Sequence, residues 1–201
     1  VTDTQAPTVL VKNITVYLDA SGNVSITPAQ INNGSTDNCG IASVTLDKTS
    51  FNCSNVGANT VNLTVTDIHG NSTTVAATVT VVDAIKPTVN TPAAQVFCQN
   101  TAASYTVPAI AVSDNCGIAS VSYAITGATN RTGSGLNASG AFAVGNSTIT
   151  WTVTDVNNNV TVVAVPVTVN PAPTATISVS TPDAFCNKLT LTANSSSVIT
   201  G

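Results

Sequence analysis

The stretch TDNCGIASV at residues 36–44 returns almost unchanged as SDNCGIASV at residues 113–121. A second echo follows each copy, since VNLTVTD at residues 61–67 recurs as ITWTVTD at residues 149–155. Such internal similarity is typical of chains built from repeated units. The repeats predict small domains in series, and we place their boundaries at residues 1–83, 84–170 and 171–201, the last being the start of a third, truncated domain.

The composition predicts an all-β chain. Of the 201 residues, 43% are hydrophobic and only 7% are charged. Val and Thr, which favour strands, are abundant, and so are the turn-forming residues Asn, Asp, Gly and Ser. Every acidic residue is Asp, and Glu is absent from the sequence. Because few good helix formers remain, we expect strands joined by short turns.

Six stretches of the first repeat have strand character. Apolar and polar residues alternate in the last two of them, as in an antiparallel strand with one buried face. In the second repeat Ile149, Trp151 and Val153 occupy the matching inward positions. Short strands at this spacing predict tandem immunoglobulin-like β-sandwich domains in an elongated array. The six stretches are residues 8–11, 14–18, 24–27, 41–46, 61–66 and 74–82.

The second repeat carries an insert of about eleven residues, ITGATNRTGSG at residues 125–135. Its Gly and Thr content predicts a longer hairpin or a surface loop. A binding role for this insert, through Arg131, is an open alternative, and it would make the segment a ligand- or carbohydrate-binding module. Trp151 is a second candidate platform for a sugar, but its inward phase favours packing in the core.

Four of the five cysteines fall as one pair per repeat, which predicts two disulfide bonds, Cys39–Cys53 and Cys98–Cys116. A bond between Cys53 and Cys98 across the repeats is an alternative, because connectivity cannot be deduced from a sequence. Disulfides of small β domains persist in oxidising compartments, so the pairs predict a secreted chain. Free thiols in a reducing cytosol are the competing interpretation. We expect Cys186 to pair with a residue beyond the end of the sequence.

Charge and hydropathy argue against two classes of partner. The net charge is −4, and the five Lys and Arg residues are scattered, so no basic patch is available for nucleic acid. No apolar run approaches the roughly 20 residues of a membrane-spanning helix, so we expect no membrane insertion.

The sequence predicts no catalytic site. His69 is the only histidine, it falls in an expected turn, and Asn157 takes its place in the second repeat. A Ser-His-Asp arrangement would therefore exist in one copy only. No Asp pair has the pattern of a general acid and base, and no Gly-rich phosphate loop or CxxC zinc motif is present. We expect no enzyme and no cofactor, with structural calcium as the open exception.

Two sets of three Asp residues are the candidate calcium ligands. In an immunoglobulin-like fold, the loop between the second and third strands and the last hairpin loop share the end where the chain enters. Each set combines one residue from each loop with one from the linker, and Ca²⁺ prefers six to eight oxygen ligands. The alternative is that these residues only cap turns through the backbone. The sets are Asp3, Asp37 and Asp67, and Asp83, Asp114 and Asp155.

The DNCGIASV segment, followed by VGANTVNLTVTD at residues 56–67, resembles the hyalin-repeat (HYR-like) family. Members are immunoglobulin-like sandwich domains arranged in tandem. The sequence of these motifs is similar to that of repeats in the very large surface adhesins of gliding bacteria. The resemblance covers about residues 1–170. It implies export by the type IX secretion route and display on the cell surface, at the exterior of the outer membrane.

The resemblance also implies a function and a set of partners. It implies a non-enzymatic stalk segment that serves surface adhesion and gliding motility. The expected partners are neighbouring immunoglobulin-like repeats of the same chain and proteins of envelope anchoring or secretion. Surface polysaccharide or the substratum would be contacted through other regions. An accessory region of a secreted hydrolase is the remaining alternative, which the flanking sequence would decide.

Overall fold

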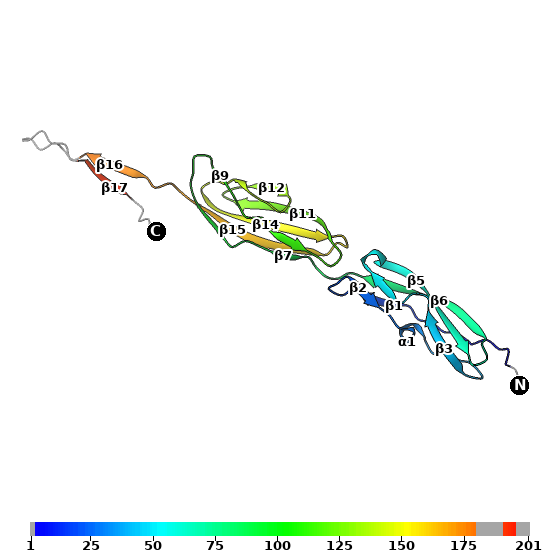
Figure 1. Cartoon of the computed structure of the whole chain (residues 1–201). Coiled ribbons are helices and arrows are strands. Elements are labelled where there is room, and N and C mark those ends of the chain that lie inside the picture. The colour runs from blue at the N-terminus through cyan, green and yellow to red at the C-terminus, as the bar shows by residue number, and fades with distance from the viewer. Residues whose placement is uncertain (1–2, 180–190, 196–201) are drawn as a thin grey trace, which may run out of the picture. The chain divides into compact units, whose positions relative to one another are not determined.

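Alternating Val and Thr residues form the longest strands of the computed structural model, which describes residues 3–179 and 191–195 (Figure 1). The all-β prediction is confirmed, because strands dominate the described residues and the one α-helix among them, α1 (Pro28–Ile31), has four residues. Among the described residues, no helix has the length and apolar character needed to cross a bilayer.

The chain forms two compact units, each described here by itself. Both draw on more than one stretch of sequence, and the predicted boundaries at residues 83 and 170 stay predictions. The first unit contains Val1–Asn90, Ala111–Val121 and Thr152–Val163, and the second contains Thr91–Ile110, Ser122–Trp151 and Ala164–Gly201.

The first repeat has a four-stranded sheet in the order β1-β6-β5-β3. Its first strand runs parallel to β6, and the other neighbours are antiparallel. A smaller antiparallel sheet pairs β2 with β4. A sheet in this order that faces a second sheet, with the first strand at the edge beside the last, is an immunoglobulin-like arrangement. The strands are β1 (Ile14–Tyr17), β2 (Asn23–Ser25), β3 (Ile41–Leu46), β4 (Ser50–Asn52), β5 (Gly57–Asp67) and β6 (Ser72–Val82).

The core of the first repeat comes from the inward positions that the sequence predicts. Val61, Leu63 and Val65 of β5 are fully buried, and they share the inward face of the sheet with Val79 and Val81 of the neighbouring β6. Side chains from the smaller sheet and from α1 close the other side. Burial of this apolar surface is the main force that holds the two sheets together. The remaining buried members are Leu18, Ile26, Ile31, Phe51 and Ala77.

Three local features of the first repeat differ from the sequence-based expectation. Residues 8–11 form only isolated bridges, Thr8 to Thr36 and Val11 to Asn32, instead of a strand. β4 is not predicted from the sequence, because its three residues are too few for an alternating pattern. α1, which begins with a proline and a Thr27–Gln30 capping box, is not predicted either.

The second repeat has a five-stranded sheet in the order β12-β11-β14-β15-β8. Two-stranded ladders pair β7 with β10 in the first unit and β9 with β13 in the second. The strands are β7 (Thr88–Asn90), β8 (Gln95–Cys98), β9 (Ser104–Tyr105), β10 (Ala111–Ser113), β11 (Ile118–Gly127), β12 (Arg131–Ser134), β13 (Gly140–Ala141), β14 (Gly145–Asp155) and β15 (Val160–Asn170).

The insert of the second repeat forms a hairpin. Its residues Arg131–Ser134 are β12, which pairs antiparallel with β11 from Ser122 to Ile125. The prediction of a longer hairpin is therefore confirmed. Trp151 of β14 is fully buried, as its inward phase predicts, and its ring centroid lies 6.4 Å from that of Tyr123.

Beyond the second repeat, β16 (Ala175–Val179) pairs antiparallel with β17 (Leu191–Ser195). This pair of strands falls in the segment for which we predict a third domain. Cys186 lies outside the described residues, so the prediction about its partner stays open.

Candidate metal sites

Two acidic clusters lie in the first unit. The first acidic cluster comprises Asp3, Asp37 and Asp67, and the second acidic cluster comprises Asp83, Asp114 and Asp155. In each cluster one carboxylate oxygen from every residue lies within 4.8 Å of the others. Asp67, Asp83 and Asp155 are 1%, 6% and 1% exposed, and they are the buried charged side chains of the described residues. The structure thus brings each predicted set together, while the binding of a metal stays a prediction.

The strand ladder positions the residues of the first cluster. Asp67 is the last residue of β5, and it pairs with Ile41 at the start of β3. Asp37 lies in the loop that leads into β3, so the ladder holds it beside Asp67. Asp3 is tied to the same end because the side-chain amide of Asn71 donates to its carbonyl oxygen at 3.2 Å. The second cluster is built in the same way from β14, β11 and the linker.

One oxygen of each loop aspartate caps its own turn. Oδ1 of Asp37 accepts hydrogen bonds from the backbone N–H groups of Cys39 at 2.8 Å and Gly40 at 3.1 Å. Asp114 accepts the equivalent pair at 2.9 and 3.1 Å. Turn capping, the alternative to metal binding, therefore does take place. It uses only Oδ1, so it leaves the second oxygen of each carboxylate for another partner.

Several oxygens of the clusters are buried without a hydrogen-bond donor among the described residues. Buried polar atoms nearly always have a partner, so each such oxygen requires an explanation. Oxygens that share one Ca²⁺ at about 2.4 Å lie no more than about 4.8 Å apart, which is the spacing found here. The clusters can therefore hold a calcium-sized cation. The oxygens are Oδ2 of Asp3, Asp37, Asp83 and Asp114, and at the second cluster also Oδ1 of Asn115 and Asn157.

No lysine or arginine of the described residues forms an ion pair with either cluster. Among the described residues, Nδ1 of His69 lies 3.9 Å from Oδ2 of Asp3, and this contact is an ion pair only when the imidazole is protonated. Burial raises the pKa of Asp67, but hydrogen bonds from Asn71, His69 and Gly70 outweigh it and hold that pKa below its ordinary value. Three carboxylate oxygens thus lie close together in each cluster with no lysine or arginine partner among the described residues, an arrangement that a bound cation would stabilise.

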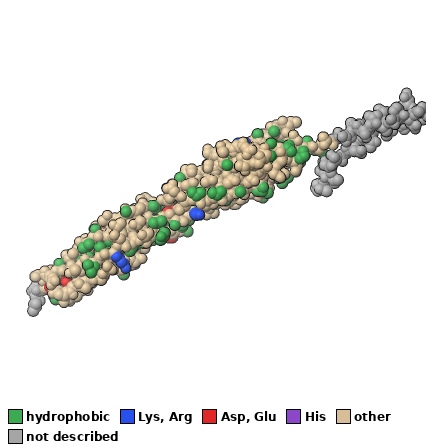
Figure 2. Space-filling model, turned by 180° about the vertical axis from the view of Figure 1, so that it is seen from behind, with side chains coloured by type: hydrophobic (Ala, Val, Ile, Leu, Met, Phe, Trp, Pro, Cys, Tyr) green, Lys and Arg blue, Asp and Glu red, His purple; other side chains and the backbone are tan. Residues whose placement is uncertain are grey.

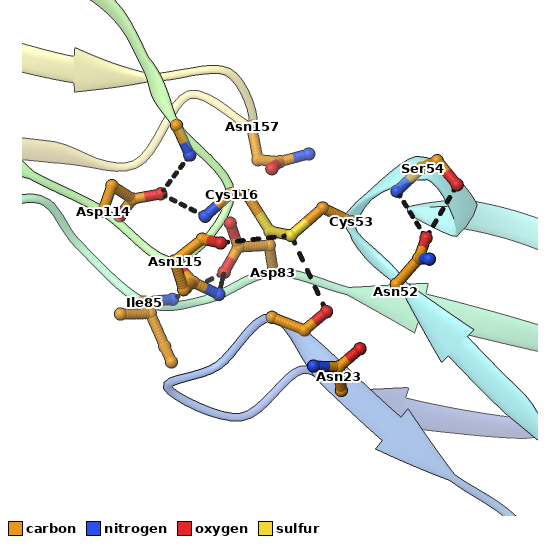
Figure 3. The surroundings of a disulfide bond; sticks show 12 residues. Asn23, Asn52, Cys53, Ser54, Asp83, Ile85, Asp114, Asn115, Cys116 and Asn157 are labelled. Carbon is orange, nitrogen blue, oxygen red and sulfur yellow. Dashed lines mark hydrogen bonds between the residues drawn. A yellow bond between two sulfur atoms is a disulfide. The ribbon is translucent and has the colours of Figure 1, made fainter.

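The disulfide prediction was wrong in its pairing. The bond joins Cys53 to Cys116, with Cα atoms 5.4 Å apart (Figure 3). Cys39 and Cys98 are free and exposed. The predicted Cys39–Cys53 and Cys98–Cys116 bonds and the alternative Cys53–Cys98 bond are therefore absent. A bond between the two repeats does exist, but its second member is Cys116.

The sandwich geometry explains why Cys39 and Cys53 cannot pair. Cys39 precedes β3, whose first residue lies opposite Asp67 at the end of β5. Cys53 precedes Gly57, the first residue of β5. The 11 residues of β5 span on the order of 35 Å at about 3.4 Å per residue, whereas a disulfide needs Cα atoms within about 7 Å. Two cysteines close in sequence thus lie at opposite ends of the sandwich.

The disulfide packs against the backbone of a glycine, Gly22. Gly22 has φ +75°, and a Cβ there would lie 2.7 Å from Sγ of Cys53 and 2.9 Å from the carbonyl oxygen of Asn115. The side-chain amide of Asn115 donates to the carbonyl oxygen of Asp19 at 3.3 Å and to Oδ1 of Asp83 at 3.2 Å. The bond and the second acidic cluster are therefore parts of one connected structure.

The structure does not place His69, the other candidate catalytic residue of the sequence, in a catalytic arrangement among the described residues. His69 is exposed in its turn. It lies with Asp3 and Cys39 in a three-ligand group that the sequence did not reveal, because its members are distant along the chain. This group is not a repeated feature, since Asn157 replaces the histidine in the second repeat.

Arg131 and Trp151 serve the interior of the second unit. The guanidinium of Arg131 donates to the carbonyl oxygens of Ala138 and Ser139 and lies 5.1 Å from the ring centroid of Phe142. Trp151 is fully buried, so its ring cannot be a surface platform for a sugar. These contacts weaken the alternative of a binding site at the insert.

Comparison with known proteins gives fold-level likeness alone. No protein-family model and no curated protein sequence matches the chain. Fibronectin(III)-like modules of Clostridium thermocellum CbhA are 18% identical, with 83% of this chain and 95% of that chain covered and a TM-score of 0.36. Mouse cadherin-23 EC22-24 is 13% identical, with 88% and 70% covered and a TM-score of 0.46.

Protocadherin gamma B7 domains 1-4 are also 13% identical, with a TM-score of 0.41 and 89% of this chain covered, and the chain spans 54% of that protein's length. These likenesses are too distant to assign a function. The assignment to the immunoglobulin-like β-sandwich class rests on the chain's own strand order.

Proposed function

We propose that the chain is a calcium-stabilised, non-enzymatic stalk segment of a secreted cell-surface adhesin. The observation that carries the proposal is the pair of equivalent acidic clusters, one at the start of each repeat, with buried carboxylate oxygens that lack a donor. A cation at each cluster would fix the linker residue to two loops of the domain that follows. Such a segment holds its neighbours in place and transmits force.

The disulfide and the surface support this proposal. A Cys53–Cys116 bond is typical of a chain that folds in an oxidising compartment outside the cytoplasm. Figure 2 shows a face on which charged side chains are few and hydrophobic ones are scattered among uncharged polar groups. Such a face suits a spacer, since no large apolar patch of the kind found at binding sites is visible on it. The HYR-like motif adds the finer proposal of an SprB-like gliding-motility adhesin exported by type IX secretion.

The stalk role predicts that the segment can be replaced. In the full-length protein on the cell surface, exchanging residues 1–170 for two unrelated β-sandwich domains should preserve adhesion and gliding, because only reach and strength matter. Deleting the same residues without replacement should impair both. Cell adhesion and gliding speed are the readouts, and antibody labelling of intact cells confirms display. Loss of adhesion in the exchanged strain would instead favour a ligand-binding module.

Asp83→Asn should have opposite effects on stability with and without calcium. The substitution removes one negative charge from the second cluster, so the calcium-free protein should melt at a higher temperature than the wild type. It also removes a ligand oxygen, so calcium affinity at this cluster should fall by at least about 100-fold, because the loss of an outer-shell partner alone costs a metal site about 10- to 100-fold. The melting temperature in calcium should therefore fall.

Asp47→Asn is the matched control for this experiment. Asp47 accepts hydrogen bonds from the backbone N–H and the side-chain amide of Asn62, outside both clusters, and it carries the same charge. Its substitution should leave the calcium affinity unchanged. A parallel shift of both melting temperatures in Asp83→Asn, in the same direction, would show that Asp83 stabilises the fold without a metal.

A further inference from the structure

The loop that carries Cys39 has the same structure as the loop that carries Cys116. Beyond the aspartate caps described above, the carbonyl oxygen of Gly40 accepts a hydrogen bond from the N–H of Ile68 at 3.2 Å. Its counterpart Gly117 accepts one from Val156 at 3.1 Å. The linker aspartates Asp3 and Asp83 occupy the same place in the two clusters. The two loops therefore present their asparagine and cysteine from matching frameworks.

The two loops differ in what covers them. Asn115 and Cys116 are half-buried, and the cysteine is bonded to Cys53 of the preceding repeat. Asn38 and Cys39 are exposed, and the cysteine is free. A hollow of about 250 Å³ adjoins the first loop and one of about 240 Å³ adjoins the second, which is also lined by Ala20 of the preceding repeat.

The end of the first repeat forms a socket for such a loop. We define the socket by Gly22, Cys53 and the carbonyl oxygen of Asp19, which together hold Asn115 and Cys116. Within the described residues this is the one place where the structure shows what covers a DNCG loop. The occupant that fits the exposed loop is therefore a module that carries the same socket.

We propose that Cys39 is the receiving half of a second disulfide joint, formed with the Cys53-equivalent cysteine of a preceding module of this same type. Asn38 then covers the first acidic cluster as Asn115 covers the second, donating to Asp3 and to the carbonyl oxygen of the socket. The bond forms when the two thiols lose two protons and two electrons to a disulfide oxidant, which is reduced to two thiols. The proposal does not depend on calcium.

A tandem fusion tests the joint. Residues 1–82 are placed directly before Asp3 of the full chain, because Val82 precedes Asp83 in the sequence and Asp3 is its counterpart. The added copy contains all the buried residues of the first repeat's core. It carries Cys39→Ser, so that the only remaining Cys39 belongs to the original chain. Trypsin then gives the added Cys53 a peptide of unique mass, since it continues across the new junction to Lys12.

The expected result is a disulfide between this junction peptide and the peptide of residues 13–48, with loss of Cys39 reactivity toward iodoacetamide in the unreduced protein. The matched control carries Cys53→Ser in the added copy and should return Cys39 to full reactivity, as in the single chain. The Cys53–Cys116 bond of the original chain should persist in both. Hydrogen exchange of the junction peptide establishes that the added copy is folded. A folded copy beside a fully reactive Cys39 would overturn the proposal.

Discussion

Replacing Cys53 and Cys116 together by serine will lower the free energy of unfolding of the first unit by about 4 kcal/mol. The two cysteines are 63 residues apart in the sequence, and in the chain-entropy model closing a loop of this length restricts the unfolded chain by about that amount. Denaturant unfolding of the double variant and of the oxidised wild type measures the difference. Reducing the wild-type protein should produce the same loss.

Cys98→Ser is the control for this prediction. Cys98 is free and exposed at the end of β8, so its replacement should leave the stability unchanged. If the double variant unfolds at the same denaturant concentration as the wild type, the bond contributes no net stability. The joint between the repeats would then have to be held by other contacts.

Trp151→Ala should cost the second unit about 3–5 kcal/mol, the range for removal of a buried aromatic side chain. Trp151 is the largest of the fully buried side chains among the described residues, and Tyr123 packs beside it. Alanine would leave a cavity that the sheet cannot close, because protein interiors are close-packed. Thermal or denaturant unfolding gives the free-energy difference.

Trp151→Phe is the informative companion variant. Nε1 of Trp151 is buried and has no acceptor among the described residues. Phenylalanine removes this unpaired N–H, whose burial costs about 1–3 kcal/mol, and so offsets part of the packing that it loses. We expect a cost below about 2 kcal/mol. A phenylalanine variant as unstable as the alanine variant would mean that Nε1 has a partner in solution, such as a buried water.

Periodic features of the sequence predicted the sheets well. Apolar and polar residues alternate in β5 and β6 because one face of each strand is buried, and this alternation is visible in the sequence. Elements too short for a period were missed, as with the three residues of β4. The disulfide pairing was wrong because nearness along the chain says little about nearness across a sandwich. Cys39 and Cys53 lie near opposite ends of β5, and Cys53 is bonded instead to Cys116 of the next repeat.

The acidic clusters show more clearly what cannot be predicted from the sequence. The loop order of an immunoglobulin-like fold was enough to group Asp3 with Asp37 and Asp67. The sequence could not show that Oδ1 of Asp37 caps its turn while Oδ2 is left buried without a donor. It also could not reveal that Asn115 approaches Asp83, because that contact depends on the joint between the repeats.

The most direct test of the central claim is the number of calcium ions that the intact chain binds, measured by equilibrium dialysis or titration calorimetry in excess magnesium. We predict two ions per chain, one at each acidic cluster. The second should bind more tightly, because Asn157 offers an oxygen where the first cluster has His69. Asp83→Asn should weaken calcium binding at the tighter site by at least about 100-fold and leave the other site unchanged. Binding of no calcium, or binding that Asp83→Asn does not change, would contradict the account.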